Sequence, residues 1–296
     1  MHKIGVLTEE RYLNPVENNW YIDNIITEDN LIVSELKRLN LDCSRVAWDS
    51  SEDLSVFDFF VFRTTWNYFE KLNQFTEFLQ KHRGHTTMIN SYEQIIWNLD
   101  KRYLLELSMG GVNIPNSILV KKNSTVKLTD IIRQNKWKEI VIKPCVSAAA
   151  WSTYRISEDN VNGFEAVFKK LTTTNDMLVQ EYQKNIESFG EVSIIMIDGN
   201  YSHAIKKLAK PGDFRVQDDF GGTIHEYRPS KKELIFAKNV ISKINETPIY
   251  ARVDIMVDNN GKIALSELEL IEPELWFRRC PNSAKSLARA IQKKYF

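Results

Sequence analysis

The sequence has little cysteine, no excess charge of either sign and no long apolar run. Its 296 residues include three cysteines, Cys43, Cys145 and Cys280, which lie far apart and form no CxxC motif or Cys/His cluster. Neither a disulfide framework nor a zinc site is therefore indicated. Lysine and arginine total 39, as do aspartate and glutamate, so no global field attracts nucleic acid or an anionic membrane.

No segment approaches the roughly 18 consecutive apolar residues that a membrane-spanning helix needs. The N-terminus, MHKIGVLTEE, reaches charged residues within a few positions and lacks the apolar region of a secretion signal. We therefore expect a cytoplasmic protein with reduced cysteines that binds neither nucleic acid nor a membrane.

Apolar segments and amphipathic patterns alternate over the first 90 residues. Strands are expected at 3–7, 42–49, 57–63 and 86–90. Helices are expected at 26–40, opened by Thr27-Glu28-Asp29, and at 69–82. This alternation predicts a small, mostly parallel sheet. No GxGxxG motif follows the first strand, which argues against a dinucleotide-binding Rossmann domain.

The pattern changes near residues 91 and 178. A long helical pattern covers 91–111 and ends at Gly110-Gly111. Beyond it we expect strands at 117–122, 138–144, 177–182, 191–199 and 201–209, helices near 129–135, 160–171, 234–244 and 283–294, and a β-hairpin at 250–270. The class is therefore α/β with α+β parts, in three expected units, 1–90, 91–177 and 178–296.

The hairpin gathers charged residues on one face. With a turn at Asn259-Asn260, Asp254 lies opposite Leu265 and Arg252 opposite Glu267. Opposed residues point to the same face, so Asp254, Glu267 and Glu269 are expected together, beside Arg252. Three close carboxylates repel one another unless a cation lies between them, and magnesium prefers oxygen ligands. The alternative is a solvated edge strand with unrelated acidic residues.

This acidic set resembles the metal triad of ATP-grasp enzymes such as D-alanine–D-alanine ligases and glutathione synthetases. Those families usually end the motif with asparagine. Glu269 departs from that pattern, and the ELELIEP segment at 267–273 resembles a smaller group of O-ureidoserine cyclo-ligase-type proteins. The resemblance implies an N-terminal domain followed by two α+β subdomains that clasp ATP with magnesium, or manganese in its place.

The resemblance extends to further residues in the same order along the chain. It implies that Lys101 and Lys143 contact phosphates. It implies that the VQEY segment, with Gln180 and the backbone of Glu181 and Tyr182, meets the adenine edge, and that Glu191 holds the ribose. Lys206 and Arg215 are the implied catalytic cations at the transferring phosphate. Each residue also has a plain structural alternative, such as a solvated lysine or a polar strand position.

One segment departs from the family pattern. Relatives commonly carry glycine in the loop that covers the phosphates, whereas residues 145–155 contain Ala148, Ala149 and Ala150. Glycine lets backbone N–H groups approach phosphate closely, so an alanine-rich loop is expected to be stiffer. Ser147, Ser152 and Thr153 remain able to donate hydrogen bonds there.

The activity implied by the resemblance is ATP-dependent ligation of a small amino-acid-like carboxylate to an amine-type nucleophile, within one molecule or between two. The segment at the end of the buried strand 57–63 offers Arg63, Trp66 and Asn67 as candidates for holding the substrate. Arg252 on the hairpin is another candidate, as are Asp29 and Asn30 at the preceding helix. A peptide-modifying ligase and an ATP-binding protein without turnover are the alternatives. A homodimer is left open.

Overall fold

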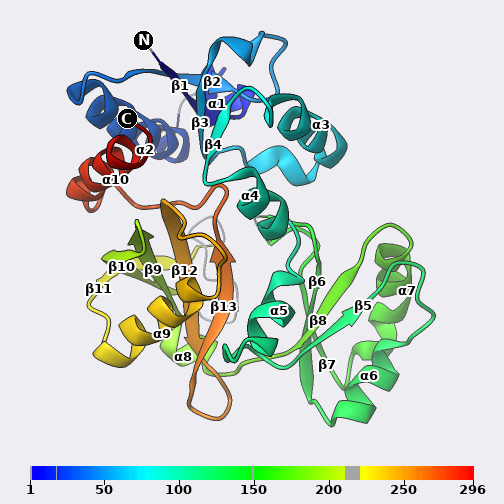
Figure 1. Cartoon of the computed structure of the whole chain (residues 1–296). Helices are drawn as coiled ribbons and strands as arrows, with labels where there is room; N and C mark the ends of the chain where they lie inside the picture. Colours follow the sequence, from blue (N-terminus) through cyan, green and yellow to red (C-terminus); the bar gives the residue numbers. More distant parts are fainter. Residues whose placement is uncertain (1, 18, 149, 211–220) are drawn as a thin grey trace.

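The computed structural model describes residues 2–17, 19–148, 150–210 and 221–296, which form three β-sheets with helices packed around them (Figure 1). The N-terminal sheet is wholly parallel, in the order β2-β1-β3-β4. Its strands are β1 (Lys3–Thr8), β2 (Asp42–Ala47), β3 (Phe59–Thr64) and β4 (Thr87–Ile89). All six residues of β3 are buried, because helices cover both faces of the sheet.

Helix α2 (Trp20–Arg38) covers one face and α3 (Leu72–His82) the other. The shorter elements of this part are α1 (Glu10–Leu13) and the 3₁₀ helices η1 (Leu54–Val56) and η2 (Trp66–Phe69). The start predicted for α2 at residue 26 is wrong. The helix begins at Trp20, because the side chain of Asn19 accepts hydrogen bonds from the N–H groups of Tyr21 and Ile22, both at 3.0 Å.

The second sheet is antiparallel, in the order β5-β8-β6-β7, and α6 (Leu128–Asn135) and α7 (Val161–Thr172) pack on it. Its strands are β5 (Ser117–Val120), β6 (Glu139–Pro144), β7 (Tyr154–Ser157) and β8 (Met177–Glu181). The single helix predicted at 91–111 is two, α4 (Tyr92–Asn98) and α5 (Tyr103–Met109). Lys101 lies in the break between them, where its N–H donates to Cys145 O at 2.8 Å.

The third sheet is also antiparallel, in the order β11-β10-β9-β12-β13. Its strands are β9 (Glu191–Ile197), β10 (Asn200–Leu208), β11 (Thr223–Tyr227), β12 (Tyr250–Val257) and β13 (Ile263–Glu269). Helix α9 (Lys231–Ser242) packs on it through Ala237, Val240 and Ile241, and α8 (Ile186–Phe189) is a short turn before β9.

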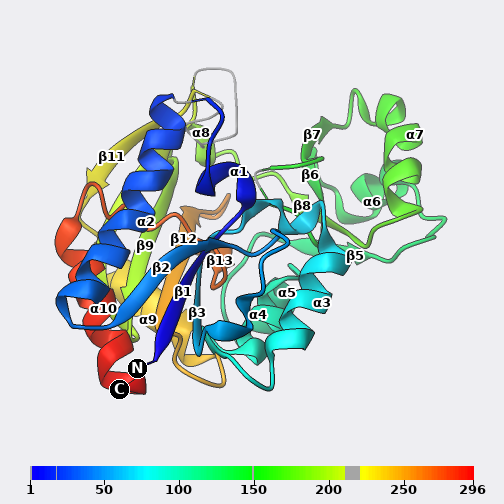
Figure 2. The ribbon, with the colours of Figure 1, turned by 90° about the horizontal axis from the view of Figure 1, so that it is seen from above.

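The last helix, α10 (Pro281–Tyr295), returns to the N-terminal sheet and lies beside α2 (Figure 2). Strand β8 pairs with β5 and β6, so the expected boundary after residue 177 would cut a strand of the second sheet. We propose that the second unit extends to Glu181 and that α10 belongs structurally with residues 2–90. No helix among the described residues is long and apolar enough to span a membrane.

Glu9, directly after β1, is a buried carboxylate with an incomplete set of partners. Its Oε1 accepts a hydrogen bond from Arg11 Nε at 2.6 Å, whereas its Oε2 is buried without a partner. Burial raises the pKa of Glu9 to about 7 despite the ion pair with Arg11. The protonated form is thus the one that folding favours, and the stability that it provides is lost as the pH rises from 4.5 through about 7.

We therefore expect Glu9→Gln to gain stability relative to the wild type as the pH rises. The free energy of unfolding of the variant minus that of the wild type should increase by about 2 kcal/mol between pH 5 and pH 8. Urea unfolding at both pH values measures this difference. An equal difference at the two pH values would show that Glu9 ionises normally in the folded protein.

Candidate active site

A cleft of about 310 Å³ lies where the three sheets meet. Thirteen of the predicted site residues line it, from all three parts of the chain: Arg63, Trp66, Lys101, Lys143, Ser147, Gln180, Glu181, Tyr182, Glu191, Arg252, Asp254, Glu267 and Glu269. Lys206 and Asn67 do not line the cleft, and Arg215 lies outside the described residues.

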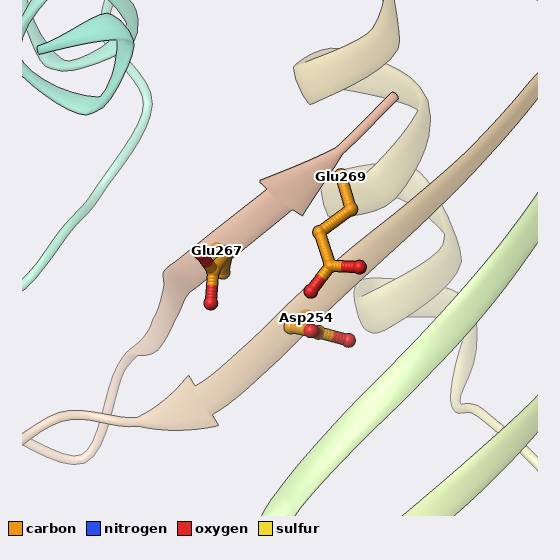
Figure 3. A group of neighbouring side chains, drawn as sticks. All are labelled: Asp254, Glu267 and Glu269. Atoms are coloured by element: carbon orange, nitrogen blue, oxygen red, sulfur yellow. The ribbon is translucent and has the colours of Figure 1, made fainter. Parts of the chain in front are cut away.

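The three predicted metal ligands meet on neighbouring strands. Asp254 on β12 pairs with Glu267 on β13, and Glu269 lies two residues farther along β13. One carboxylate oxygen from each lies within 4.8 Å of the others, and Figure 3 shows the side chains turned toward a common space. Opposite oxygen ligands of magnesium lie about 4.2 Å apart, twice the usual metal–oxygen distance. The donor set therefore fits a magnesium ion after small side-chain adjustments.

The register predicted for this hairpin is wrong in detail, although the shared face is as expected. Asp258 N–H donates to Lys262 O, and Gly261, with a φ of 73°, completes a three-residue loop in place of the two-residue turn. A β-bulge then leaves Ser266 unpaired between Asp254↔Glu267 and Ile255↔Leu265. Each irregularity shifts the register by one residue. The two shifts together restore the face of the acidic residues, whereas Leu265 moves to the core.

Basic side chains compensate the triad. Arg252 Nη2 lies 2.8 Å from Asp254 Oδ2 and also contacts Glu269, whereas Lys101 Nζ lies 3.1 Å from Glu267 Oε1. Although burial alone would raise it, the positive charges of Lys101, Lys143 and Arg252 lower the pKa of Glu267 to about 2. Burial and repulsion from the other two carboxylates raise the pKa of Glu269. Each carboxylate of the triad is thus paired with a basic side chain, and Glu269 still experiences repulsion from its neighbours.

The two lysines predicted to contact phosphates both line the cleft, but they differ in their partners. Lys101 is buried, and its Nζ donates to Ser147 O at 2.5 Å. Burial lowers the pKa of Lys143, for which no ion pair with a described residue is found. A lysine that has no carboxylate partner in a cleft is suited to an anionic ligand.

The loop after β6 adopts the backbone conformation that glycine would favour, without glycine. Ala150 and Ser152 have φ values of 53° and 51°, in the left-handed region. Ala148, Ala150 and Thr153 line the cleft, whereas Ser152 does not. The Trp151 ring lies 5.7 Å from that of Phe69, so this loop also touches the N-terminal part of the protein.

Lys206 is a correction to the predicted site. Successive strand residues point to opposite faces, and Lys206 on β10 turns away from the cleft, with its Nζ 4.2 Å from the centre of the Phe189 ring. The next residue, Lys207, is 5% exposed and lines the cleft. Its Nζ lies 2.5 Å from Glu191 Oε1 and 3.7 Å from Asp254 Oδ2. The HAIKK segment contained both lysines, and only the strand register distinguishes them.

The segment predicted to meet adenine lies at the edge of the second sheet. The N–H groups of Glu181 and Tyr182 donate to Asn116 O at 2.8 Å and Glu139 O at 3.0 Å. Those two donors are therefore used within the protein, whereas the carbonyl groups keep a second lone pair each. Glu191 accepts a hydrogen bond from Ser266 Oγ at 2.7 Å, in addition to its contact with Lys207.

Two predicted substrate residues hold the main chain instead. Arg63 Nη1 donates to Pro273 O at 3.0 Å, and Trp66 Nε1 donates to Glu272 O at 2.9 Å. Both still line the cleft.

The other candidates on this side serve the fold. Asn67 is a correction, because its side chain bridges Trp48 Nε1 and Asp49 Oδ2, at 2.9 and 2.7 Å, outside the cleft. Asp29 is fully buried against Arg45 and Thr64, and Asn30 is exposed. Several cleft residues were missed by sequence reasoning: Tyr21, Glu28, Tyr68, Lys207, Glu272, Glu274, Trp276 and Arg278.

Family models match most of the chain. The model described as D-cycloserine synthetase DcsG, N-terminal domain, matches residues 4–90. The model described as prokaryotic glutathione synthetase, ATP-grasp domain, matches residues 107–273, more than half of the 296 residues.

Relatives and solved structures agree with these matches. The cycloserine biosynthesis protein DcsG of Streptomyces lavendulae is 25% identical over 264 residues, which cover 83% of this chain and 86% of that protein. A probable alpha-L-glutamate ligase of Aeromonas salmonicida (strain A449) is 26% identical over 187 residues, 61% of this chain and 59% of that protein.

The crystal structure of D-cycloserine synthetase DcsG superposes with a TM-score of 0.83 at 22% identity and covers 99% of both chains. That of D-alanine–D-alanine ligase from Bacillus anthracis gives 0.64 at 14% identity, over 99% of this chain and 97% of the other. The fold expected from the sequence is confirmed.

Proposed function

Because this chain belongs to the ATP-grasp family of ATP-dependent ligases, we propose that it binds ATP with magnesium in the cleft and activates a small amino-acid-like carboxylate for attack by an amine-type nucleophile. The observation that carries the proposal is the meeting of Asp254, Glu267 and Glu269 in one cleft with Lys101 and Lys143. Phosphoryl transfer needs carboxylates that hold a divalent cation and lysines that contact the phosphates, and this cleft has both kinds of residue.

In the first step, an oxygen of the substrate carboxylate bonds to the γ-phosphorus of ATP, the bond from that phosphorus to the β–γ bridging oxygen breaks, and ADP leaves. Magnesium held by the acidic triad would neutralise charge on the β- and γ-phosphates. Lys101 and Lys143 supply further positive charge, and Arg252 lies beside the triad, where a guanidinium suits the substrate carboxylate. We propose that Arg215 contributes another cation at the transferring group.

In the second step, the amine nitrogen bonds to the carbonyl carbon of the acyl phosphate, loses a proton, and phosphate leaves. The acyl phosphate hydrolyses in water, so the cleft must exclude solvent during this step. The loop at 145–155, already in contact with Phe69 through Trp151, is suited to that task. A reaction that consumes ATP also favours a cytoplasmic location.

The names of the relatives support a small substrate, since they refer to cycloserine biosynthesis, glutamate ligation and D-alanine–D-alanine ligation. A peptide-modifying ligase is the second candidate. A RiPP-associated ATP-grasp ligase from Chryseobacterium gregarium, in complex with ADP and a leader and core peptide, superposes with a TM-score of 0.67 at 11% identity. The match of residues 4–90 to the DcsG model favours the small-molecule candidate.

ADP release tests the proposal. We expect the purified protein to release ADP from ATP in the presence of magnesium and at least one member of a panel of free amino acids, tested singly and in pairs. Omitting magnesium should remove the signal. Binding of ATP without ADP release above background, for every amino acid and pair, would contradict a small-molecule ligase.

A further inference from the structure

Strand β13, which carries Glu267 and Glu269, forms an edge of the third sheet, with β12 on its inner side. In an edge strand, the backbone N–H and C=O groups of alternate residues point away from the sheet and need other partners. Leu268, between the two acidic residues, is buried. Water cannot reach its backbone groups, so the protein itself must provide their hydrogen bonds.

Side chains from the corner between α4 and α5 provide these hydrogen bonds. The Tyr103 hydroxyl group accepts a hydrogen bond from Leu268 N at 3.0 Å, and Asn98 Nδ2 donates to Leu268 O at 2.8 Å. Asn98 Oδ1 also accepts a hydrogen bond from Leu270 N at 2.7 Å, so one amide group spans the backbone on both sides of Glu269. Asn98 thus binds the outer edge of β13 as the backbone of a further strand would.

The inner edge of β13 is irregular beside the metal ligands. The β-bulge leaves Ser266 unpaired directly before Glu267, and a bulge disrupts the ladder of hydrogen bonds locally. The pairing with β12 therefore defines the position of Glu267 less firmly than an unbroken ladder would. Asn98 and Tyr103 bind the outer edge of the strand only one residue beyond Glu267, where such support has the largest effect.

The break between α4 and α5 makes this arrangement possible. In a continuous helix, Asn98 and Tyr103 would point about 140° apart, so both could not face one strand. Lys101 lies between them in the chain. Its N–H donates to Cys145 O at 2.8 Å, and its Nζ lies 3.1 Å from Glu267 Oε1. Three residues of one short, anchored segment therefore contact β13 at the acidic triad.

We propose that Asn98 and Tyr103 are positioning residues of the metal site, which hold β13 so that its two carboxylates stay within reach of one divalent cation. The inference rests on the proposed function, because that function requires the acidic triad to bind the cation. The ligands of a metal ion must keep their places to within about 0.5 Å, and the hydrogen bonds around a metal site set those places. Both residues act through the backbone of β13.

Manganese binding in the presence of ADP tests this inference without any turnover. The relaxation rate of water protons distinguishes manganese that the protein holds from free manganese and from manganese on free ADP. We expect Asn98→Ala to weaken manganese binding about 10- to 100-fold, as the loss of a group that orients metal ligands typically does. Tyr103→Phe removes one hydrogen bond and keeps the ring, so it should weaken manganese binding about threefold to tenfold. This variant serves if Asn98→Ala does not fold.

Asn113→Ala is the matched control, because it removes another asparagine side chain from the outer edge of β13. Asn113 Nδ2 donates to Ile263 O at 2.9 Å, at the end of the strand away from the triad, and Asn113 does not line the cleft. Manganese binding should therefore change less than about twofold in this variant. Hydrogen exchange at the Leu270 amide should become faster in Asn98→Ala only, because Asn98 Oδ1 is its partner.

Unchanged manganese affinity in Asn98→Ala and Tyr103→Phe would overturn the inference. An equal loss of affinity in Asn98→Ala and Asn113→Ala would also overturn it, because it would show a general effect on the fold. Failure of the proposed function looks different, since the wild type would then bind manganese with ADP without ever releasing ADP from ATP. A wild type that binds no manganese with ADP would overturn both.

Discussion

Glu267→Gln should lower magnesium-dependent ADP release by about 10²- to 10³-fold. The substitution removes one charged oxygen donor of the triad and the carboxylate that pairs with Lys101 at 3.1 Å. A bound metal ion supplies several kcal/mol of stabilisation to the charge in the transition state, and each 1.4 kcal/mol corresponds to about tenfold in rate. A coupled assay for ADP at several magnesium concentrations measures the effect, and excess magnesium should restore part of the rate.

A loss of stability must be separated from this loss of activity. Lys101 is buried, so the variant leaves its ammonium group with Ser147 O as its remaining described partner. The thermal unfolding of Glu267→Gln should therefore be measured beside its activity. Glu267→Asp, which keeps the negative charge, is the control variant. A folded Glu267→Gln with wild-type rates at every magnesium concentration would remove Glu267 from the metal site.

Lys207→Met should reduce kcat/KM for ATP about 10- to 100-fold, whereas Lys206→Met should change it less than about twofold. Lys207 lies between Glu191 and Asp254, so its loss leaves the half-buried carboxylate of Glu191 and the buried one of Asp254 less well oriented. Residues that orient metal ligands typically account for effects of this size. Lys206 contacts the rings of Phe189 and Tyr227 and does not line the cleft.

The two lysines form a matched pair, since they are neighbours of the same type on the same strand. The same assay, run with varied magnesium, should show a raised magnesium requirement in Lys207→Met only. Lys207→Arg keeps the charge and should retain more activity than the methionine variant. An equal loss in both methionine variants, or a larger loss in Lys206→Met, would contradict the strand register on which the correction rests.

The sequence predicts well that the three acidic residues lie together, because they repeat at the spacing of one strand face. Asp254, Glu267 and Glu269 therefore meet even though the predicted register is wrong. No sequence pattern indicates the bulge at Ser266. The segment around Asn259, Asn260 and Gly261 is compatible with a two-residue turn as well as with the three-residue loop that the structure shows. Alternation alone could not choose between Lys206 and Lys207, since both occur in a strand of mixed polarity.

Other predictions differ from the structure because contacts between distant parts of the chain outweigh the local sequence pattern. The helical pattern at 91–111 is continuous, so the sequence gives no sign that the helix breaks at Lys101. The break is stabilised by the hydrogen bond from Lys101 N–H to Cys145 O. Arg63 and Trp66 reach the cleft as predicted, but their polar atoms bind the main chain of a segment about 210 residues away. Glu272 belongs to the ELELIEP segment, but its place in the cleft depends on contacts of the N-terminal part with residues 270–273, which no local pattern predicts.

The position of the divalent cation tests the central claim most directly. Crystals grown with manganese and ADP allow the ion to be located by its anomalous scattering. The account predicts one strong peak within coordination distance of carboxylate oxygens of Asp254, Glu267 and Glu269, with ADP phosphate oxygens on the ion and near Lys101 and Lys143. A peak elsewhere, with Arg252 still bridging Asp254 and Glu269 and the phosphates away from both lysines, would contradict it.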